Sequence, residues 1–129
     1  MKAILFVDDH EVLARLSCEI LEMQGYKAVS AYSAKEALEK FSQQDFDILV
    51  TDVMMPQMTG DELARRLRAQ HPTLKVLYLT GFSDRLFMEK VTLWADEAFL
   101  DKPCSVKGLL EAVALLLFGR FDMPPDFVA

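Results

Sequence analysis

The chain of 129 residues carries 14 basic and 20 acidic side chains, so its formal net charge is −6, and 52% of its residues are hydrophobic. This length fits one domain, and the composition excludes a disordered or low-complexity chain. The negative charge argues against nucleic acid and anionic membrane surfaces as direct partners, and no segment approaches the ~20 apolar residues that cross a bilayer.

Short apolar runs alternate with amphipathic stretches along the whole chain. The apolar runs predict strands over residues 3–7, 26–31, 48–50, 75–79 and 98–100, and the stretches between them predict helices over about 11–23, 34–41, 60–71, 83–93 and 106–117. Capping residues mark three helix starts: Ser33 with Glu36, Thr59 with Glu62, and Ser105.

Helical spacing also predicts which side chains share an apolar face. The first helix repeats Leu13, Leu16, Ile20 and Met23. Gly25 follows it, as a residue that tolerates positive φ often does at a helix end. The last helix is expected to turn five side chains inward: Val106, Leu109, Leu110, Val113 and Leu117.

Five strand–helix units in succession predict an α/β fold with a parallel sheet covered by helices on both faces. Right-handed crossovers leave few topologies for such a chain. We expect one domain over residues 1–118, followed over 119–129 by a C-terminal tail or the start of a linker. The two cysteines, Cys18 and Cys104, do not make a disulfide framework, which favours a cytoplasmic location.

Polar residues of distinct chemistry follow four of the five predicted strands. Asp8 and Asp9 follow the first strand, Asp52 the third, Thr80 the fourth, and Lys102 the fifth. In open parallel sheets, ligands bind beyond the carboxyl ends of the strands, so the fold should gather these side chains at one edge.

The chemistry of this set favours phosphoryl transfer. Clustered carboxylates repel one another and favour a bound cation, and oxygen ligands select a hard ion such as Mg²⁺. A lysine supplies a positive charge for a phosphoryl group, and the Thr80 hydroxyl supplies a hydrogen-bond donor. Taken singly, each residue has a structural explanation such as capping a helix, but their joint position at strand ends argues for a site.

The chain resembles the receiver domains of two-component response regulators over about residues 2–118. The resemblance lies in Ile4-Leu5-Phe6-Val7-Asp8-Asp9-His10, Leu49-Val50-Thr51-Asp52-Val53-Met54-Met55-Pro56, Gly60, Leu79-Thr80-Gly81 and Phe99-Leu100-Asp101-Lys102-Pro103. It implies a doubly wound, flavodoxin-like (βα)5 fold with strand order 2-1-3-4-5.

The resemblance also implies a role for each matching residue. Asp52 would accept the phosphoryl group, and Lys102 would pair with its oxygens. Asp9, Asp52 and the backbone carbonyl of Met54 would bind Mg²⁺ directly, with Asp8 acting mainly through a water. Thr80 and Phe99 would form the switch that responds to phosphorylation.

The expected function is therefore a bacterial phosphorelay switch whose own activity is limited to self-phosphorylation and autodephosphorylation. A sensor histidine kinase or a phosphotransfer protein would donate the phosphoryl group. An unknown downstream protein would bind the face made by the fourth helix, fifth strand and fifth helix. We expect no DNA-binding output segment after residue 118, and either a stand-alone receiver or the receiver of a hybrid histidine kinase.

Two other classes of protein share parts of this pattern. An aspartate-nucleophile phosphatase also uses an aspartate after a parallel strand and Mg²⁺, but it carries Asp-x-Asp where this chain has adjacent Asp8 and Asp9. A flavin-binding module of the same topology needs a phosphate loop after the first strand, where the acidic residues here would repel a phosphate.

Overall fold

The computed structural model describes residues 1–81, 96–101 and 105–119. Its strands are β1 (Ala3–Val7), β2 (Lys27–Ala31), β3 (Ile48–Asp52), β4 (Lys75–Thr80) and β5 (Glu97–Asp101). Its helices are α1 (Glu11–Met23), α2 (Ala34–Phe41), α3 (Gly60–Gln70) and α5 (Val106–Phe118). The helix expected over 83–93, Lys102 and most of the expected tail lie outside the described residues.

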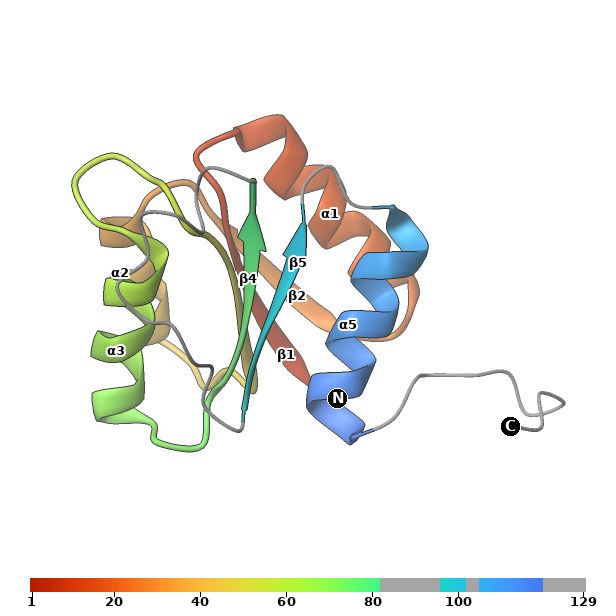
Figure 1. Cartoon of the computed structure of the whole chain (residues 1–129). Helices are drawn as coiled ribbons and strands as arrows, with labels where there is room; N and C mark the ends of the chain where they lie inside the picture. Colours follow the sequence, from red (N-terminus) through yellow and green to blue (C-terminus); the bar gives the residue numbers. More distant parts are fainter. Residues whose placement is uncertain (82–95, 102–104, 120–129) are drawn as a thin grey trace, which may run out of the picture.

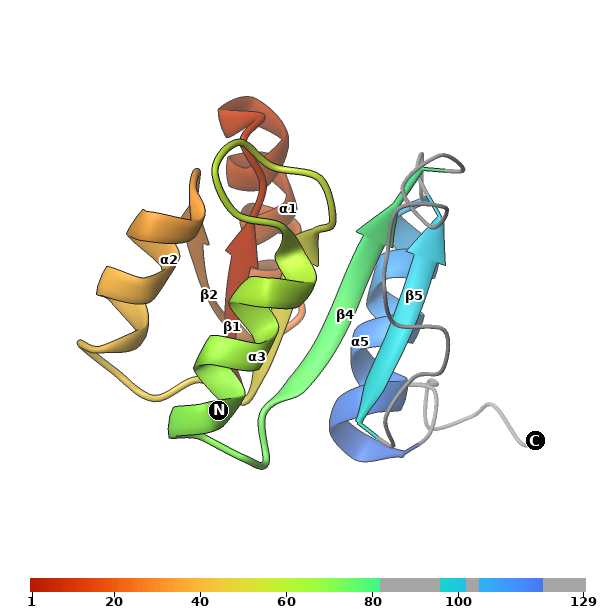
Figure 2. The ribbon, with the colours of Figure 1, turned by 60° about the vertical axis from the view of Figure 1, so that its left-hand side comes forward.

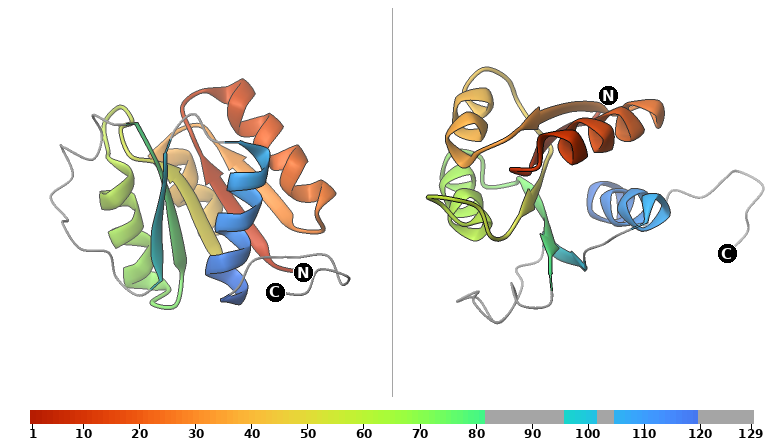
Figure 3. Two further views of the ribbon diagram at one scale, coloured as in Figure 1. Left: turned by 45° about the vertical axis from the view of Figure 1, so that its right-hand side comes forward. Right: turned by 90° about the horizontal axis from the view of Figure 1, so that it is seen from above.

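The five strands form one parallel sheet in the order β2-β1-β3-β4-β5, which confirms the predicted fold class (Figure 1). Helices cover both faces of this sheet: viewed from above, α1 and α5 lie on one side and α2 and α3 on the other (Figure 3). The chain therefore builds the three-layer arrangement that buries both faces of parallel strands.

Helices α2 and α3 lie next to each other over one face of the sheet (Figure 2). Side chains at alternate strand positions pack against them. Leu5, Leu49 and Tyr78 from the sheet meet Ala37 and Leu67 from the two helices. All five are fully shielded from solvent. Each of these two helices therefore turns apolar side chains toward the sheet.

The opposite face is covered by α1 and α5, and here the predicted inward side of α1 is wrong. Leu13, Leu16 and Met23 are 46%, 48% and 83% exposed, whereas α1 buries Ala14, Ser17, Cys18 and Leu21. Most of the buried residues of α1 have small side chains. The helix therefore packs its small residues against the sheet and leaves larger apolar side chains in solvent.

The last helix, α5, keeps part of its predicted face. Leu109 and Val113 are buried, Leu110 and Leu117 pack partly against the core, and Ala114 joins the buried set. Val106 is instead 51% exposed, because it lies in the first turn, directly after the capping residue.

Two of the three predicted side-chain caps are present. The Ser33 and Ser105 hydroxyls accept hydrogen bonds from the backbone N–H of Glu36 (3.1 Å) and Gly108 (2.9 Å). Thr59 occupies the cap position of α3 but makes no side-chain capping bond. Gly25 adopts φ +96°, the left-handed conformation expected after α1.

Candidate functional site

Three carboxylates meet where β1 and β3 end. The two strands are neighbours in the sheet, with Val7 paired to Thr51, so Asp8, Asp9 and Asp52 leave the same edge together. A ligand atom from each of them, and one from the His10 ring, all lie within 4.8 Å of one another. The predicted gathering of these aspartates is confirmed, and His10 joins them.

The start of α1 fixes the orientation of Asp8. Its Oδ1 accepts the backbone N–H of His10 at 2.9 Å and lies 3.2 Å from Nδ1 of the His10 ring. The same ring nitrogen is 3.6 Å from Oδ1 of Asp9. Asp8 and Asp52 are 0% and 4% exposed, whereas Asp9 and His10 face solvent, so the cluster is buried on one side and open on the other.

The donor set of this cluster fits a hard divalent cation. Carboxylate oxygens are the ligands that Mg²⁺ prefers, and Mg²⁺ takes only one or two carboxylates while keeping several waters. The open side formed by Asp9 leaves room for those waters. Met54, whose carbonyl is the fourth predicted ligand, lies two residues beyond Asp52 in the loop that leaves β3.

The loop after β3 brings α3 into contact with the backbone of Asp52. The Gly60 N–H donates to the Val53 carbonyl at 2.7 Å. A Cβ atom added at Gly60 would lie 2.1 Å from the Asp52 carbonyl oxygen, far inside normal contact. Glycine is therefore required here, because only glycine lets the first turn of α3 approach the backbone of Asp52 this closely.

Thr80 ends β4, the strand next to Asp52. Asp52 is paired with Leu79, which places Thr80 one residue further toward the edge that carries the acidic cluster. Thr80 is fully buried, and its hydroxyl donates a hydrogen bond to Oδ1 of Asp101 on β5 at 3.2 Å. Sequence reasoning did not single out the side chain of Asp101.

Phe99 lies on the same face of the sheet as Thr80. It is paired with Tyr78 across β4 and β5, and the two ring centroids are 5.4 Å apart. Phe99 is only partly buried against the core.

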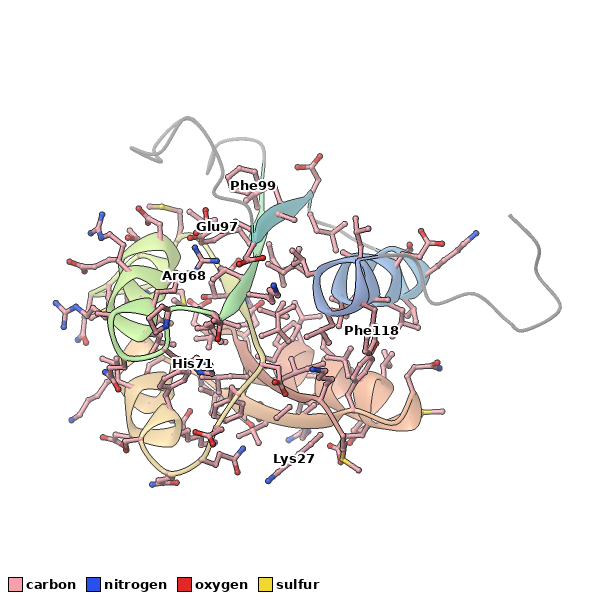
Figure 4. The ribbon with its side chains drawn as sticks, turned by 90° about the horizontal axis from the view of Figure 1, so that it is seen from below. Lys27, Arg68, His71, Glu97, Phe99 and Phe118 are labelled. Carbon is pink, nitrogen blue, oxygen red and sulfur yellow. The ribbon has the colours of Figure 1, made fainter. Side chains whose placement is uncertain are left out.

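A buried ionic cluster lies on that face, near the opposite end of β5, and was not predicted. Arg68 of α3 donates to the Glu97 carboxylate at 3.3 Å and to the backbone carbonyls of Leu74 and Asp96 (Figure 4). The Tyr78 hydroxyl donates to the same Glu97 oxygen at 3.3 Å. Burial, and then the negative charge of Glu97, raise the pKa of Tyr78 well above its usual range.

One sequence signal could have revealed this cluster. Arg68 follows Leu67 on the buried side of an amphipathic helix, and Glu97 stands directly before the apolar core of the fifth strand. A positive and a negative residue, each placed among apolar neighbours, are expected to be buried only if they are paired. The predicted site residue Lys102 lies outside the described residues.

Comparison with known proteins identifies the family. Residues 4–114 match the response regulator receiver domain. The chain belongs to this family. Receiver domains are signalling switches of two-component systems rather than conventional enzymes, and they interact with histidine kinases or phosphotransfer proteins. The phosphatase and flavin-binding alternatives do not explain this match.

Two curated relatives come from Brucella abortus. The response regulator receiver protein CpdR is 32% identical over 92% of this chain and 99% of its own length. The sensor kinase CckA is 34% identical over 88% of this chain, which spans only 12% of that kinase. Receiver domains similar to this one thus occur both alone and within much longer proteins.

Solved receiver structures share the fold. The receiver domain of the hybrid histidine kinase CckA has 27% identity and a TM-score of 0.75, over 89% of this chain and 98% of that one. The response regulator TrrA of Thermotoga maritima, in complex with Mg²⁺-BeF, has 34% identity and a TM-score of 0.77, over 91% of this chain and all of that one. Within the described part of the receiver domain, no helix is long and apolar enough to span a membrane.

Proposed function

We propose that this receiver domain is a phosphorylation-activated switch and that Asp52 accepts the phosphoryl group. The observation that carries the proposal is the meeting of Asp8, Asp9 and Asp52 within 4.8 Å at the ends of two adjacent strands. A carboxylate that is held next to two others, on a rim open to solvent, is suited to attack a phosphoryl group once a cation offsets the repulsion.

The transfer is a displacement at phosphorus. An ionised Asp52 oxygen attacks the phosphoryl group of a partner's phosphohistidine, the new O–P bond forms, and the N–P bond breaks with its electron pair returning to the imidazole. Later, water attacks the acyl phosphate, which releases inorganic phosphate and restores the Asp52 carboxylate. Neither step requires an oxidant or a further co-substrate.

Asp9, Asp52 and the Met54 carbonyl would hold Mg²⁺, with Asp8 acting mainly through a bound water. When bound, the ion neutralises charge on the phosphoryl oxygens. The solved structure of TrrA with Mg²⁺-BeF supports this assignment. Lys102, which directly follows Asp101 in the sequence, would pair with the phosphoryl oxygens.

Thr80 and Phe99 would carry the change away from Asp52. Thr80 ends the strand next to Asp52, and Phe99 lies two residues further from the rim on the neighbouring strand, opposite Tyr78. Movement of the Thr80 hydroxyl toward the phosphoryl group would vacate space beside the Phe99 ring. The ring would then turn between its partly exposed position and a more buried one.

The donor protein would dock beside the acidic rim. Val12, Leu13 and Leu16 lie in the first two turns of α1, close in sequence to Asp9, and each is 46% exposed or more. Apolar side chains grouped next to a reactive carboxylate suit a histidine kinase or a phosphotransfer protein, whose phosphohistidine must reach Asp52.

The downstream partner would bind the face that includes β5 and α5. On α5, Leu115 and Phe118 are 43% and 49% exposed. The fourth helix, which was expected over about 83–93 and would complete this face, lies outside the described residues. We propose a stand-alone receiver or the receiver of a hybrid kinase, as CpdR and CckA exemplify.

Mass spectrometry after incubation with acetyl phosphate tests the function. With Mg²⁺ present, the wild type should gain one phosphoryl group, and hydroxylamine should remove it because the linkage is an acyl phosphate. Asp52→Asn should abolish the adduct. Asp45→Asn is the matched control, since Asp45 is exposed and lies before β3, at the opposite end from Asp52.

Undiminished labelling of Asp52→Asn would show that another residue is the acceptor. Equal labelling of the wild type with and without Mg²⁺ would instead leave Asp52 as the acceptor and remove the role proposed for the cation.

A further inference from the structure

The hydrogen bond between Thr80 and Asp101 joins a proposed switch residue to a side chain with no assigned role. The two residues are directly paired across the β4–β5 ladder, and the Thr80 hydroxyl donates to Oδ1 of Asp101 at 3.2 Å. Thr80 is fully buried, whereas Asp101 is exposed at the end of β5. The carboxylate thus reaches back from the surface to a hydroxyl inside the protein.

A threonine hydroxyl has a single proton to donate. While that proton is directed at Asp101, the hydroxyl cannot donate it to a phosphoryl oxygen on Asp52. The two acceptors therefore compete for one donor, and both are anionic, which makes either bond stronger than one to a neutral oxygen. The balance between the two positions of Thr80 depends on both acceptors.

We infer that Asp101 is a positioning residue that retains the Thr80 hydroxyl in its unphosphorylated position and so opposes activation. The inference rests on the proposed function, because it takes the phosphoryl group on Asp52 as the competing acceptor. A ligand that requires the minor conformation of a protein binds more weakly by the fraction of molecules in that conformation. Removal of the Asp101 acceptor therefore raises the apparent affinity for a phosphoryl mimic.

Beryllium fluoride with Mg²⁺ is the probe, and its apparent dissociation constant is measured by calorimetric titration. Asp101→Ala removes the acceptor and should bind beryllium fluoride about three- to tenfold more tightly, the range set by the loss of one hydrogen bond. Asp101→Asn keeps an acceptor of the same shape but removes its charge, so its affinity should lie between those of Asp101→Ala and the wild type.

A charge effect must be separated from a hydrogen-bond effect, because removal of any nearby negative charge favours an anionic ligand. Thr80→Val deletes the hydroxyl with little change of shape. If Asp101 acts through Thr80, the gain from Asp101→Ala disappears in the Thr80→Val background. A purely electrostatic gain persists there and is screened by added salt. The unfolding temperature of each variant without ligand verifies that it is folded.

Tighter binding by Asp101→Ala that is lost in the double variant establishes the positioning role. Unchanged affinity of Asp101→Ala, or a gain that persists with Thr80→Val, overturns the positioning role. If the wild type still binds beryllium fluoride in that case, the proposed function stands. A wild type that neither binds beryllium fluoride nor is labelled at Asp52 overturns the proposed function and this inference together.

Discussion

Two groups of buried carboxylates lie at opposite ends of the sheet, and they are arranged in opposite ways. At the carboxyl ends of β1 and β3, Asp8 and Asp52 are brought together with a third aspartate. At the start of β5, Glu97 is matched by the Arg68 guanidinium and the Tyr78 hydroxyl. The first group concentrates like charge beside an opening, whereas the second pairs opposite charge in the interior.

This difference distinguishes a candidate functional site from a structural ion pair. A buried carboxylate whose charge is matched by residues of the same chain has its interactions completed by folding. Carboxylates that are gathered together repel one another, and a bound cation offsets that repulsion. The same chemical group, a carboxylate, is thus part of a buried ion pair at Glu97 and is the proposed phosphoryl acceptor at Asp52.

The largest expected effect on stability comes from breaking the buried cluster of Arg68, Glu97 and Tyr78. Glu97→Ala leaves the Arg68 guanidinium buried without its counter-charge and should lower the free energy of unfolding by about 3 kcal/mol. This value is at the low end of the usual range because Arg68 keeps its bonds to the Leu74 and Asp96 carbonyls. Urea unfolding at neutral pH measures the change.

The matched control for that variant is Glu62→Ala, which breaks the exposed pair with Arg66. An exposed pair is worth less than about 1 kcal/mol, so this variant should remain close to the wild type. Equal costs for the two variants would mean that burial of the Arg68–Glu97 pair does not determine its contribution.

The next effect concerns the contact by which α3 reaches the acidic group. Gly60→Ala forces a Cβ against the Asp52 carbonyl and should cost about 1–3 kcal/mol of stability. Because the backbone of Asp52 must shift, phosphorylation by acetyl phosphate should slow more than stability alone accounts for. Gly108→Ala is the control, since the nearest atom to its added Cβ is the Ser105 hydroxyl oxygen at 3.2 Å, at the start of α5. Labelling of Gly60→Ala at the wild-type rate would contradict this account.

Alkaline pH should lower the stability of the protein through ionisation of Tyr78 in the cluster with Arg68 and Glu97. Burial, and then Glu97, raise its folded pKa above the ordinary value of 10.0, so the unfolded chain loses this proton first. Stability is thus retained below about pH 10.0 and falls above it, by about 1.4 kcal/mol per pH unit. Tyr78→Phe should remove this part of the slope in pH-dependent urea unfolding.

Cys18 provides the comparison for that slope, because it is buried on the other face of the sheet. Burial, and then Glu22, raise the pKa of its thiol from 9.0 to about 12, so its contribution begins to decline near pH 9.0. Cys18→Ala should flatten the curve from pH 9.0 upward and leave the Tyr78 part intact. A Tyr78→Phe curve that is parallel to the wild type above pH 10.0 would contradict the assignment.

The smallest expected effect is the stability gained when Mg²⁺ binds to the cluster of Asp8, Asp9 and Asp52. Mg²⁺ at ten times its dissociation constant should stabilise the wild type by about 1.4 kcal/mol, because it binds the folded state alone. Asp9→Asn should remove most of this gain, and Asp45→Asn should keep it. Without Mg²⁺, Asp9→Asn should be at least as stable as the wild type, since one like charge is gone. A wild-type melting temperature that does not change when Mg²⁺ is added would show that the acidic cluster binds no cation.

The sheet could be predicted because its strands are buried on both faces. Continuous apolar runs such as Ala3–Val7, directly before a helical stretch, have no other simple explanation, and the strand ends then located Asp8, Asp9 and Asp52. The inward side of α1 could not be predicted the same way. Apolar periodicity ranks Leu13 and Leu16 above Ser17, but close packing of α1 against the sheet favours the smaller side chain.

Individual side-chain contacts could also not be predicted from the sequence. The side-chain capping bond expected at Thr59 is absent, and the next residue, Gly60, lies close against the Asp52 carbonyl. The partnership of Thr80 with Asp101 depends on the register of β4 against β5, which the sequence does not state. Roles inferred from the family resemblance, including that of Lys102, remain predictions.

The pairing of β4 with β5 also limits how the domain can change state. Three successive rungs on one face of the sheet join Val76 to Glu97, Tyr78 to Phe99 and Thr80 to Asp101. A slip of one residue between these strands would turn the whole column of β5 side chains to the opposite face. We therefore expect a change that passes along this column to involve rotation of side chains, while the two strands keep their register.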